Sequence, residues 1–155
     1  MTEDDLLGYL RQQKWAVQSS VSEAGVPQSA LIGFAISDAL EIVFDTLETT
    51  RKFANLRRNP NVAFVIGGWL YGDERTVQYQ GVVDMPVGEE LERLKAVYFA
   101  AFPEGRVRER WPGLVYVRAT PSWVRYSDFN RTPPEVQEFR FPSANVGRPS
   151  GGPQR

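Results

Sequence analysis

Segments with the residue pattern of β-strands follow one another along most of the chain, and this order constrains the fold more than any other feature. The clearest segment covers residues 75–85, where Val77 and Tyr79 alternate with Gln78 and Gln80. Such alternation is typical of a strand with one face buried. The predicted strands cover residues 14–21, 28–36, 40–46, 61–69, 75–85, 114–120 and 122–128. The short turn at 37–39 predicts that the second and third of them form a hairpin.

Helical patterns are fewer than strand patterns in this sequence. Apolar residues recur at helical spacing over residues 3–12 and, most clearly, over residues 87–102. A third, short helix is predicted over residues 50–59, where Asn59-Pro60 ends it, because a residue before proline avoids the helical region. A parallel α/β fold needs a helix between most of its strands. We therefore expect a mainly β fold, an antiparallel sheet or barrel of about seven strands.

The length of 155 residues indicates a single domain. We expect this domain to cover residues 1–142 and a disordered tail to cover residues 143–155, which are rich in Gly, Pro and Ser. The acidic N-terminus has no signal-peptide pattern, and no window approaches the roughly 20 apolar residues of a membrane span. A cytoplasmic protein is expected.

The sequence contains neither cysteine nor histidine. These absences exclude disulfides, thiolate nucleophiles, cysteine-based zinc sites and the usual catalytic triads, and we predict no metal site. The formal net charge of −1 favours neither nucleic acid nor an anionic membrane as a partner. If the protein is an enzyme, we expect a bound cofactor to carry the reactivity.

Two cations stand where a helix already presents unpaired N–H groups. Thr50 opens the short helix, and Arg51 and Lys52 follow in its first turn, although positive charge there opposes the helix dipole. A bound phosphate would offset that repulsion, because helix N-termini, guanidinium groups and hydroxyls all bind phosphate oxygens. The alternative is that both side chains are solvated. These residues alone leave the two interpretations open.

The surrounding motif resembles the split-barrel flavoproteins related to pyridoxamine 5′-phosphate oxidase. A strand ending in Phe44-Asp45-Thr46 precedes Thr50-Arg51-Lys52, and the helix closes in "NLRRNP". The upstream strand "GVPQSALIGFAI" and the later order of "VQYQGVV", a long helix and "SWVRYSDF" are also similar to that family. The resemblance covers residues 14–139.

The resemblance implies an FMN-binding split barrel that forms a homodimer with the flavin at its interface. It implies that Arg51 and Lys52 bind the FMN phosphate, and that the flavin ring lies along the strand at residues 30–33. The full implied set of cofactor-binding residues is Ala30, Leu31, Ile32, Gly33, Phe44, Asp45, Thr46, Thr50, Arg51, Lys52, Thr76, Trp123 and Arg125. The resemblance implies that the last two reach the flavin of the partner subunit. For Gly33, the open alternatives are close approach of the flat ring and a bend of the strand. Asp45 is expected either to support the site or to pair with Arg51.

Departures from the family pattern limit the functional prediction. The C-terminal segment lacks the histidine-containing basic motif of the true oxidases, so oxidation of pyridoxamine phosphate is not expected. The strand "QSALIGF" also lacks the Arg and Lys that those oxidases place there. Relatives with this barrel bind the deazaflavin F420 or haem instead of FMN. Two hypotheses follow: an FMN-dependent oxidoreductase of unknown substrate, or a non-catalytic flavin carrier or sensor. The basic loop at 103–113 is expected to be solvated, and closure over a site is the alternative.

Overall fold

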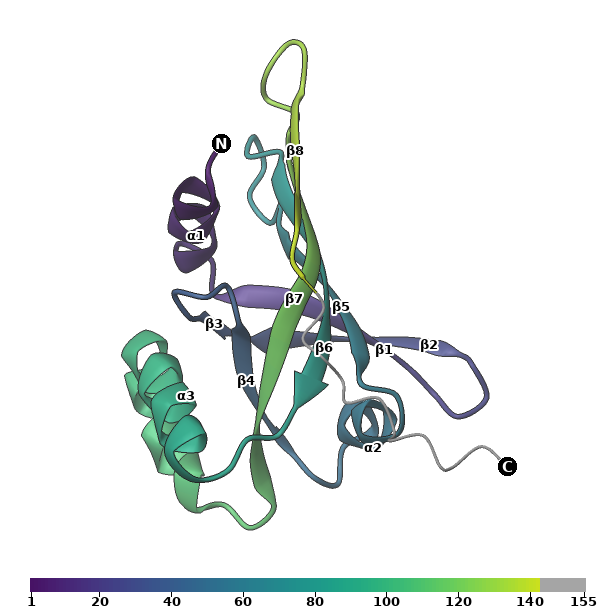
Figure 1. Ribbon diagram of the computed structural model, residues 1–155, viewed down its shortest axis with the longest axis vertical. Coiled ribbons are helices and arrows are strands. Elements are labelled where there is room, and N and C mark those ends of the chain that lie inside the picture. The colour runs from purple at the N-terminus through teal and green to yellow at the C-terminus, as the bar shows by residue number, and fades with distance from the viewer. Residues whose placement is uncertain (143–155) are drawn as a thin grey trace, which may run out of the picture.

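The computed structural model describes residues 1–142, in which one curled sheet is flanked by helices (Figure 1). The elements in chain order are α1 (Glu3–Arg11), β1 (Trp15–Val21), β2 (Pro27–Gly33), β3 (Ala35–Ile36), β4 (Ile42–Leu47), α2 (Arg51–Arg58), β5 (Asn61–Gly67), β6 (Arg75–Asp84), α3 (Gly88–Ala101), the 3₁₀ helix η1 (Pro103–Arg110), β7 (Leu114–Asp128) and β8 (Glu135–Arg140). The tail predicted to be disordered lies outside the described residues. None of the described helices is long and apolar enough to cross a membrane.

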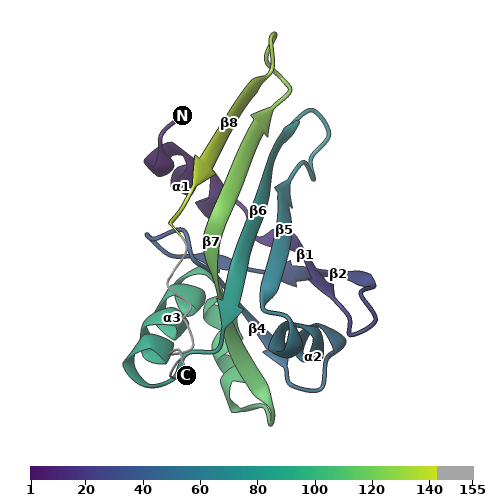
Figure 2. The same cartoon turned by 45° about the vertical axis from the view of Figure 1, so that its right-hand side comes forward.

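The sheet has eight strands in the order β2-β1-β5-β6-β7-β4-β3, and β8 adds to β7. Every pairing between neighbours is antiparallel. The sheet curls strongly, so that β1 and β2 run across the direction of β6 and β7 (Figures 1 and 2). This arrangement confirms the predicted mainly β, antiparallel split barrel.

Aromatic side chains fill the inside of the curl. Phe44 and Tyr79 pack edge-to-face against Phe64, and all three side chains are buried. The Tyr79 hydroxyl is directed at the carbonyl oxygens of Leu40 and Ala119, at 3.0 and 2.8 Å, which satisfies its polar end. Burial of such rings contributes most of the favourable free energy of a small domain.

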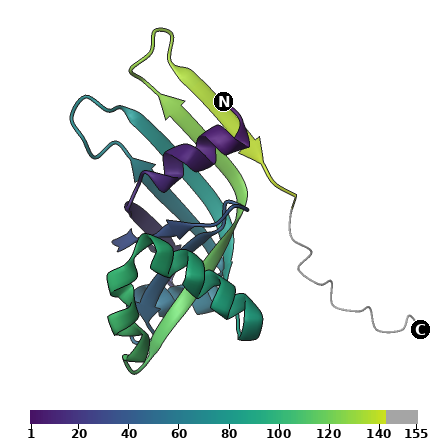
Figure 3. The ribbon, with the colours of Figure 1, turned by 90° about the vertical axis from the view of Figure 1, so that its left-hand side faces the viewer.

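The helices cover different parts of the barrel. α1 and α3 lie on the same side of the sheet, as Figure 3 shows, whereas α2 lies beside the β1–β2 hairpin (Figure 1). α1 contributes Leu6 and Leu10 to the main core, and both side chains are fully buried. α3 packs Leu94, Tyr98 and Phe99 into a second apolar cluster against β4 and β7. Of the three α-helices in residues 1–142, α2 is therefore the one that lies at the β1–β2 hairpin.

The predicted strand at 28–36 is divided in the structure. β2 ends at Gly33 and pairs with β1, whereas β3 pairs with β4, so only β3 belongs to the predicted hairpin. Phe34 lies between them with its side chain 1% exposed and its N–H donating to the Lys14 carbonyl. Burial of this ring turns the chain from one edge of the sheet to the other.

The C-terminal region differs from the prediction in three places. Residues 114–128 form one strand, because the register shift after Gln80 absorbs Ser122 as a bulge and lets Pro121 remain in β7. β8 was not predicted, since its largely exposed sequence "EVQEFR" has no buried face to produce alternation. The predicted basic loop contains the 3₁₀ helix η1.

Candidate functional site

The N-terminus of α2 is held by a network of hydroxyl groups. The Thr50 Oγ1 accepts a hydrogen bond from the Phe53 N–H at 3.3 Å and donates to the Leu47 carbonyl at 2.8 Å. It also lies 3.0 Å from the Thr46 Oγ1, which ties the helix start to the end of β4. A threonine cap of this kind satisfies one of the free N–H groups and fixes the direction of the others.

A cavity of about 360 Å³ opens beside this helix start. β1 and β2 form one side of it and α2 the other, with Gln18, Ser20, Gln28, Ser29, Ala30, Thr50, Arg51 and Lys52 as lining residues. The first turn of α2 contains no acidic residue. Among residues 1–142, neither Arg51 nor Lys52 takes part in an ion pair. Two uncompensated cations and a helix N-terminus therefore face one cavity, a combination suited to an oxyanion.

The structure brings only part of the predicted site together here. Ala30, Thr50, Arg51 and Lys52 line the cavity, and Thr46 reaches it through Thr50. The remaining residues of the predicted strand, 31–33, extend away from it along β2. Phe44 belongs to the barrel core with no exposed surface.

Gly33 has a packing explanation in this structure. A Cβ atom added at Gly33 would lie 3.1 Å from the Phe102 ring, so that ring occupies the space a side chain would need. Phe102, which follows the last residue of α3, therefore approaches this glycine closely, and contact of Gly33 with a flavin ring stays a prediction. The Lys14 ammonium lies 5.0 Å from the centre of the same ring.

Asp45 faces away from Arg51 and pairs with another arginine. Its Oδ2 accepts a hydrogen bond from the Arg108 Nε at 3.0 Å, and the Arg108 Nη2 donates to the Tyr98 Oη at 2.9 Å. Side chains alternate along a strand, so Thr46 faces α2 while Asp45 faces η1. The expected solvated loop therefore carries an arginine that is engaged with β4. The neighbouring Arg106 lies 4.5 Å from the centre of the Phe99 ring.

The last three predicted residues lie away from the α2 cavity. Thr76 lines a separate hollow of about 580 Å³ together with Gly68 and Phe129. Trp123 and Arg125 lie on β7, where the Trp123 Nε1 donates to the Glu138 carboxylate at 3.3 Å and Arg125 is 3.9 Å from it. Glu138 belongs to β8, so both contacts depend on the strand that the sequence did not predict.

A group of buried polar side chains was missed by the sequence reasoning. The Asn55 Nδ2 donates to the Ser20 Oγ at 3.1 Å and to the Gln28 Oε1 at 2.5 Å, and both of these partners line the α2 cavity. Gln18 adds a further buried amide on β1. The signal in the sequence is that Gln18 and Ser20 occupy the same strand face as buried Ala16.

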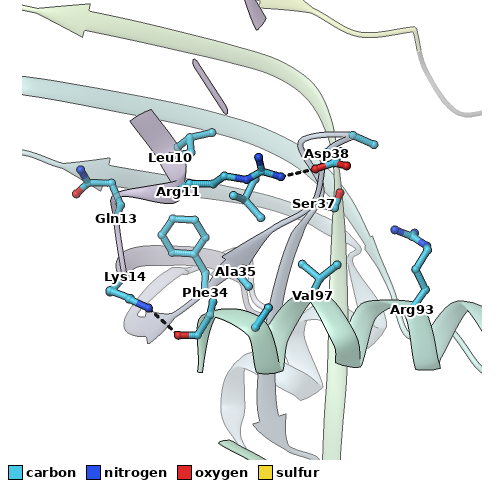
Figure 4. A pocket seen from close by; sticks show the side chains of 14 residues that line it. Leu10, Arg11, Gln13, Lys14, Phe34, Ala35, Ser37, Asp38, Arg93 and Val97 are labelled. Atoms are coloured by element: carbon cyan, nitrogen blue, oxygen red, sulfur yellow. Dashed lines mark hydrogen bonds and ion pairs between the residues drawn. The ribbon is translucent and has the colours of Figure 1, made fainter. Parts of the chain in front are cut away.

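A second cavity, of about 640 Å³, lies between α1, β3 and α3 (Figure 4). Three cations line it, but each is engaged: Arg11 with Asp38, Lys14 with the Ala101 carbonyl at 2.6 Å, and Arg93 with Glu41 at 3.0 Å. Its floor contains the buried apolar residues Leu10, Phe34 and Ile36. This cavity therefore offers less free positive charge than the cavity at α2.

The model of the pyridoxamine 5′-phosphate oxidase family matches residues 2–128, which is most of the chain. The chain therefore belongs to this family, and its split-barrel fold agrees with that assignment. No curated protein matches the sequence.

Solved structures share the fold at low sequence identity. A conserved hypothetical protein of Mycobacterium tuberculosis has a TM-score of 0.71 and 22% identity, with 97% of this chain and 95% of that chain covered. An FMN-binding protein related to pyridoxamine 5′-phosphate oxidase, from Nostoc punctiforme, has a TM-score of 0.68 and 11% identity, covering 91% and 90%. A haem-binding protein of Mycobacterium smegmatis has a TM-score of 0.72 and 15% identity, and the 83% of this chain that aligns spans only 53% of that chain. Members of this fold thus include both flavin-binding and haem-binding proteins.

Proposed function

We propose that the protein is an FMN-dependent oxidoreductase whose cofactor phosphate binds at the N-terminus of α2. The observation that supports this proposal is the cavity between α2 and β2, which Thr50, Arg51 and Lys52 line together with Ala30. The hydroxyl, guanidinium, ammonium and free N–H groups there fit a phosphate dianion. When bound, the flavin would supply hydride transfer, while the protein supplies binding, orientation and exclusion of water.

We propose further that the flavin site is completed by a second copy of the chain. On the outer face of the sheet, Leu31, Val17 and Val65 lie side by side on β2, β1 and β5. Leu31 is 62% exposed, Val65 44% and the nearby Trp15 53%. A contiguous exposed apolar strip of this kind is typical of a protein–protein interface. It adjoins the strand proposed to carry the flavin ring.

Other cofactors of the same fold are the alternatives. A histidine-ligated haem has no ligand in this chain, because the sequence contains no histidine. The deazaflavin F420 remains the alternative to FMN, since the α2 cavity recognises a phosphate rather than a ring. A non-catalytic carrier or sensor of flavin is the alternative to an enzyme.

The first experiment is to titrate the purified protein with FMN and record the flavin absorption spectrum and fluorescence. We expect FMN to bind, and we expect NADH or NADPH to reduce the bound flavin. A protein that binds FMN but does not accept hydride from either nucleotide would favour the carrier. A protein that binds neither FMN nor F420 would contradict the proposal.

The phosphate assignment is tested by changing Arg51→Ala and Lys52→Ala together. We expect FMN binding to weaken by about 2–4 kcal/mol, because two charge-assisted hydrogen-bonding groups are lost with imperfect additivity. The matched control changes Arg57→Ala and Arg58→Ala, which removes the same charge from the last turn of the same helix. Isothermal titration of both variants should show the loss only in the first. Equal FMN affinity in both variants would disprove the assignment.

A further inference from the structure

The Gln18 side chain is buried beside the α2 cavity without a hydrogen-bond partner for its amide nitrogen. Gln18 lies on β1, lines the cavity and is only 1% exposed. Its Nε2 is closed to solvent and, within the described part of the chain, has no acceptor. Water therefore cannot satisfy this group in the conformation seen, and two N–H donors remain unused.

An unused buried donor is unfavourable for the folded protein. Leaving a buried polar group without a partner destabilises the fold by about 1–3 kcal/mol, and an apolar side chain of similar shape would avoid this. The neighbouring polar groups do not share the problem, because Asn55 donates to both Ser20 and Gln28. Within this group of buried polar side chains, the Gln18 Nε2 is therefore the donor that lacks an acceptor.

Gln18 lies where its unused N–H donors could reach the phosphate of the proposed cofactor. Gln18 pairs in register with Ala30, one of the three β2 residues that line the cavity together with Arg51 and Lys52 of α2. Among the lining residues within 1–142, β1 and β2 contribute no cation, and both cations, Arg51 and Lys52, belong to α2. The terminal torsion of glutamine is soft, so the Gln18 amide nitrogen can turn toward a ligand in the cavity that this residue lines.

We propose that Gln18 is a specificity-determining residue that donates a hydrogen bond to a phosphate oxygen of the bound flavin nucleotide. This inference rests on the proposed function. The neutral amide supplies, from the strand side, a contact to the phosphate that complements Thr50, Arg51 and Lys52 on the helix side. Gln18 consequently destabilises the protein without its ligand and strengthens binding of the phosphorylated ligand.

The test is Gln18→Met, which keeps the shape of the side chain and removes both polar ends. We expect the melting temperature of the ligand-free protein to rise by about 2–4 °C, because the unsatisfied donor is gone. We expect FMN affinity to fall by about 10-fold or more, because a hydrogen bond to a charged group is lost. Affinity for riboflavin, which lacks the phosphate, should be unchanged. The control is Gln12→Met, an exposed glutamine after α1, for which neither quantity should change.

The outcomes separate this inference from the proposed function. If the wild-type protein binds FMN and Gln18→Met binds it equally well, the role of Gln18 is refuted while the proposed function stands. An equal loss of affinity for FMN and riboflavin would place the Gln18 contact on the ribityl chain or ring and refute the phosphate assignment. If the wild-type protein binds no FMN, the proposed function fails and this inference fails with it.

Discussion

Tyr9 and Tyr98 are the residues at which the structure most directly predicts a pH dependence. Burial is the main cause that raises the pKa of each phenol to about 12, and the carboxylates of Asp73 and Asp45, respectively, add to it. The Tyr9 hydroxyl donates to the Arg75 carbonyl at 2.9 Å, whereas the Tyr98 oxygen accepts from Arg108. Both environments favour the neutral phenol over the phenolate.

A pKa that is higher in the folded than in the unfolded state makes the unfolded state lose its proton first. The stability contribution of these phenols is therefore fully present below pH 10.0 and is lost as pH rises from there toward about 12. Urea unfolding at increasing pH should show this decrease, and Tyr98→Phe should make it shallower. Tyr71→Phe is the control, because the Tyr71 side chain is fully exposed. Identical pH profiles for wild type and Tyr98→Phe would contradict the prediction.

At the scale of elements, α2 depends on its cap more than on its composition. The helix has only eight residues, and Arg51 and Lys52 oppose the dipole in its first turn. Helices this short are marginal unless packing and capping support them. Phe53 and Leu56 provide the packing, and Thr50 provides the cap.

We expect Thr50→Ala to lower the free energy of unfolding by about 1 kcal/mol, which is the usual cost of losing a threonine cap. We also expect weaker FMN binding, because the first-turn N–H groups lose their fixed direction. The control is Thr49→Ala, which changes the exposed neighbouring threonine. Chemical denaturation and FMN titration of both variants provide the measurements. Unchanged stability of Thr50→Ala would show that the cap is unimportant for α2.

At the scale of the whole molecule, the exposed apolar strip on β2, β1 and β5 predicts a dimer. Light scattering should give twice the mass of one chain for the wild-type protein. Leu31→Glu should raise the dimer dissociation constant by about 100-fold or more, because a carboxylate from each copy would lose its water in the interface. Val107→Glu, at an apolar residue 75% exposed on η1, should leave the mass unchanged. A monomeric wild-type protein would rule out this interface.

Parts of the fold follow from local sequence patterns alone. Alternation at residues 75–85 corresponds to β6, and Asn59-Pro60 marks the end of α2, because pleating and the proline restriction act within a few residues. The break between β2 and β3 at Phe34 has no signal in the local sequence, because the Phe34 ring is buried by elements that are distant in the chain. The sequence of β8 has none either, because the strand is largely exposed and is positioned by its pairing with the distant β7.

Local patterns in the amino-acid sequence are enough to predict the mainly β class, the strands and helices with strong periodicity, and the cationic start of α2. These features depend on residues close together in the chain. The partner of each polar group depends on the three-dimensional packing. Asp45 accepts a hydrogen bond from Arg108, 63 residues away, and the buried Gln18 amide nitrogen has no acceptor within the described part of the chain. The physical reason is that hydrogen-bond partners and burial are set by packing between distant segments.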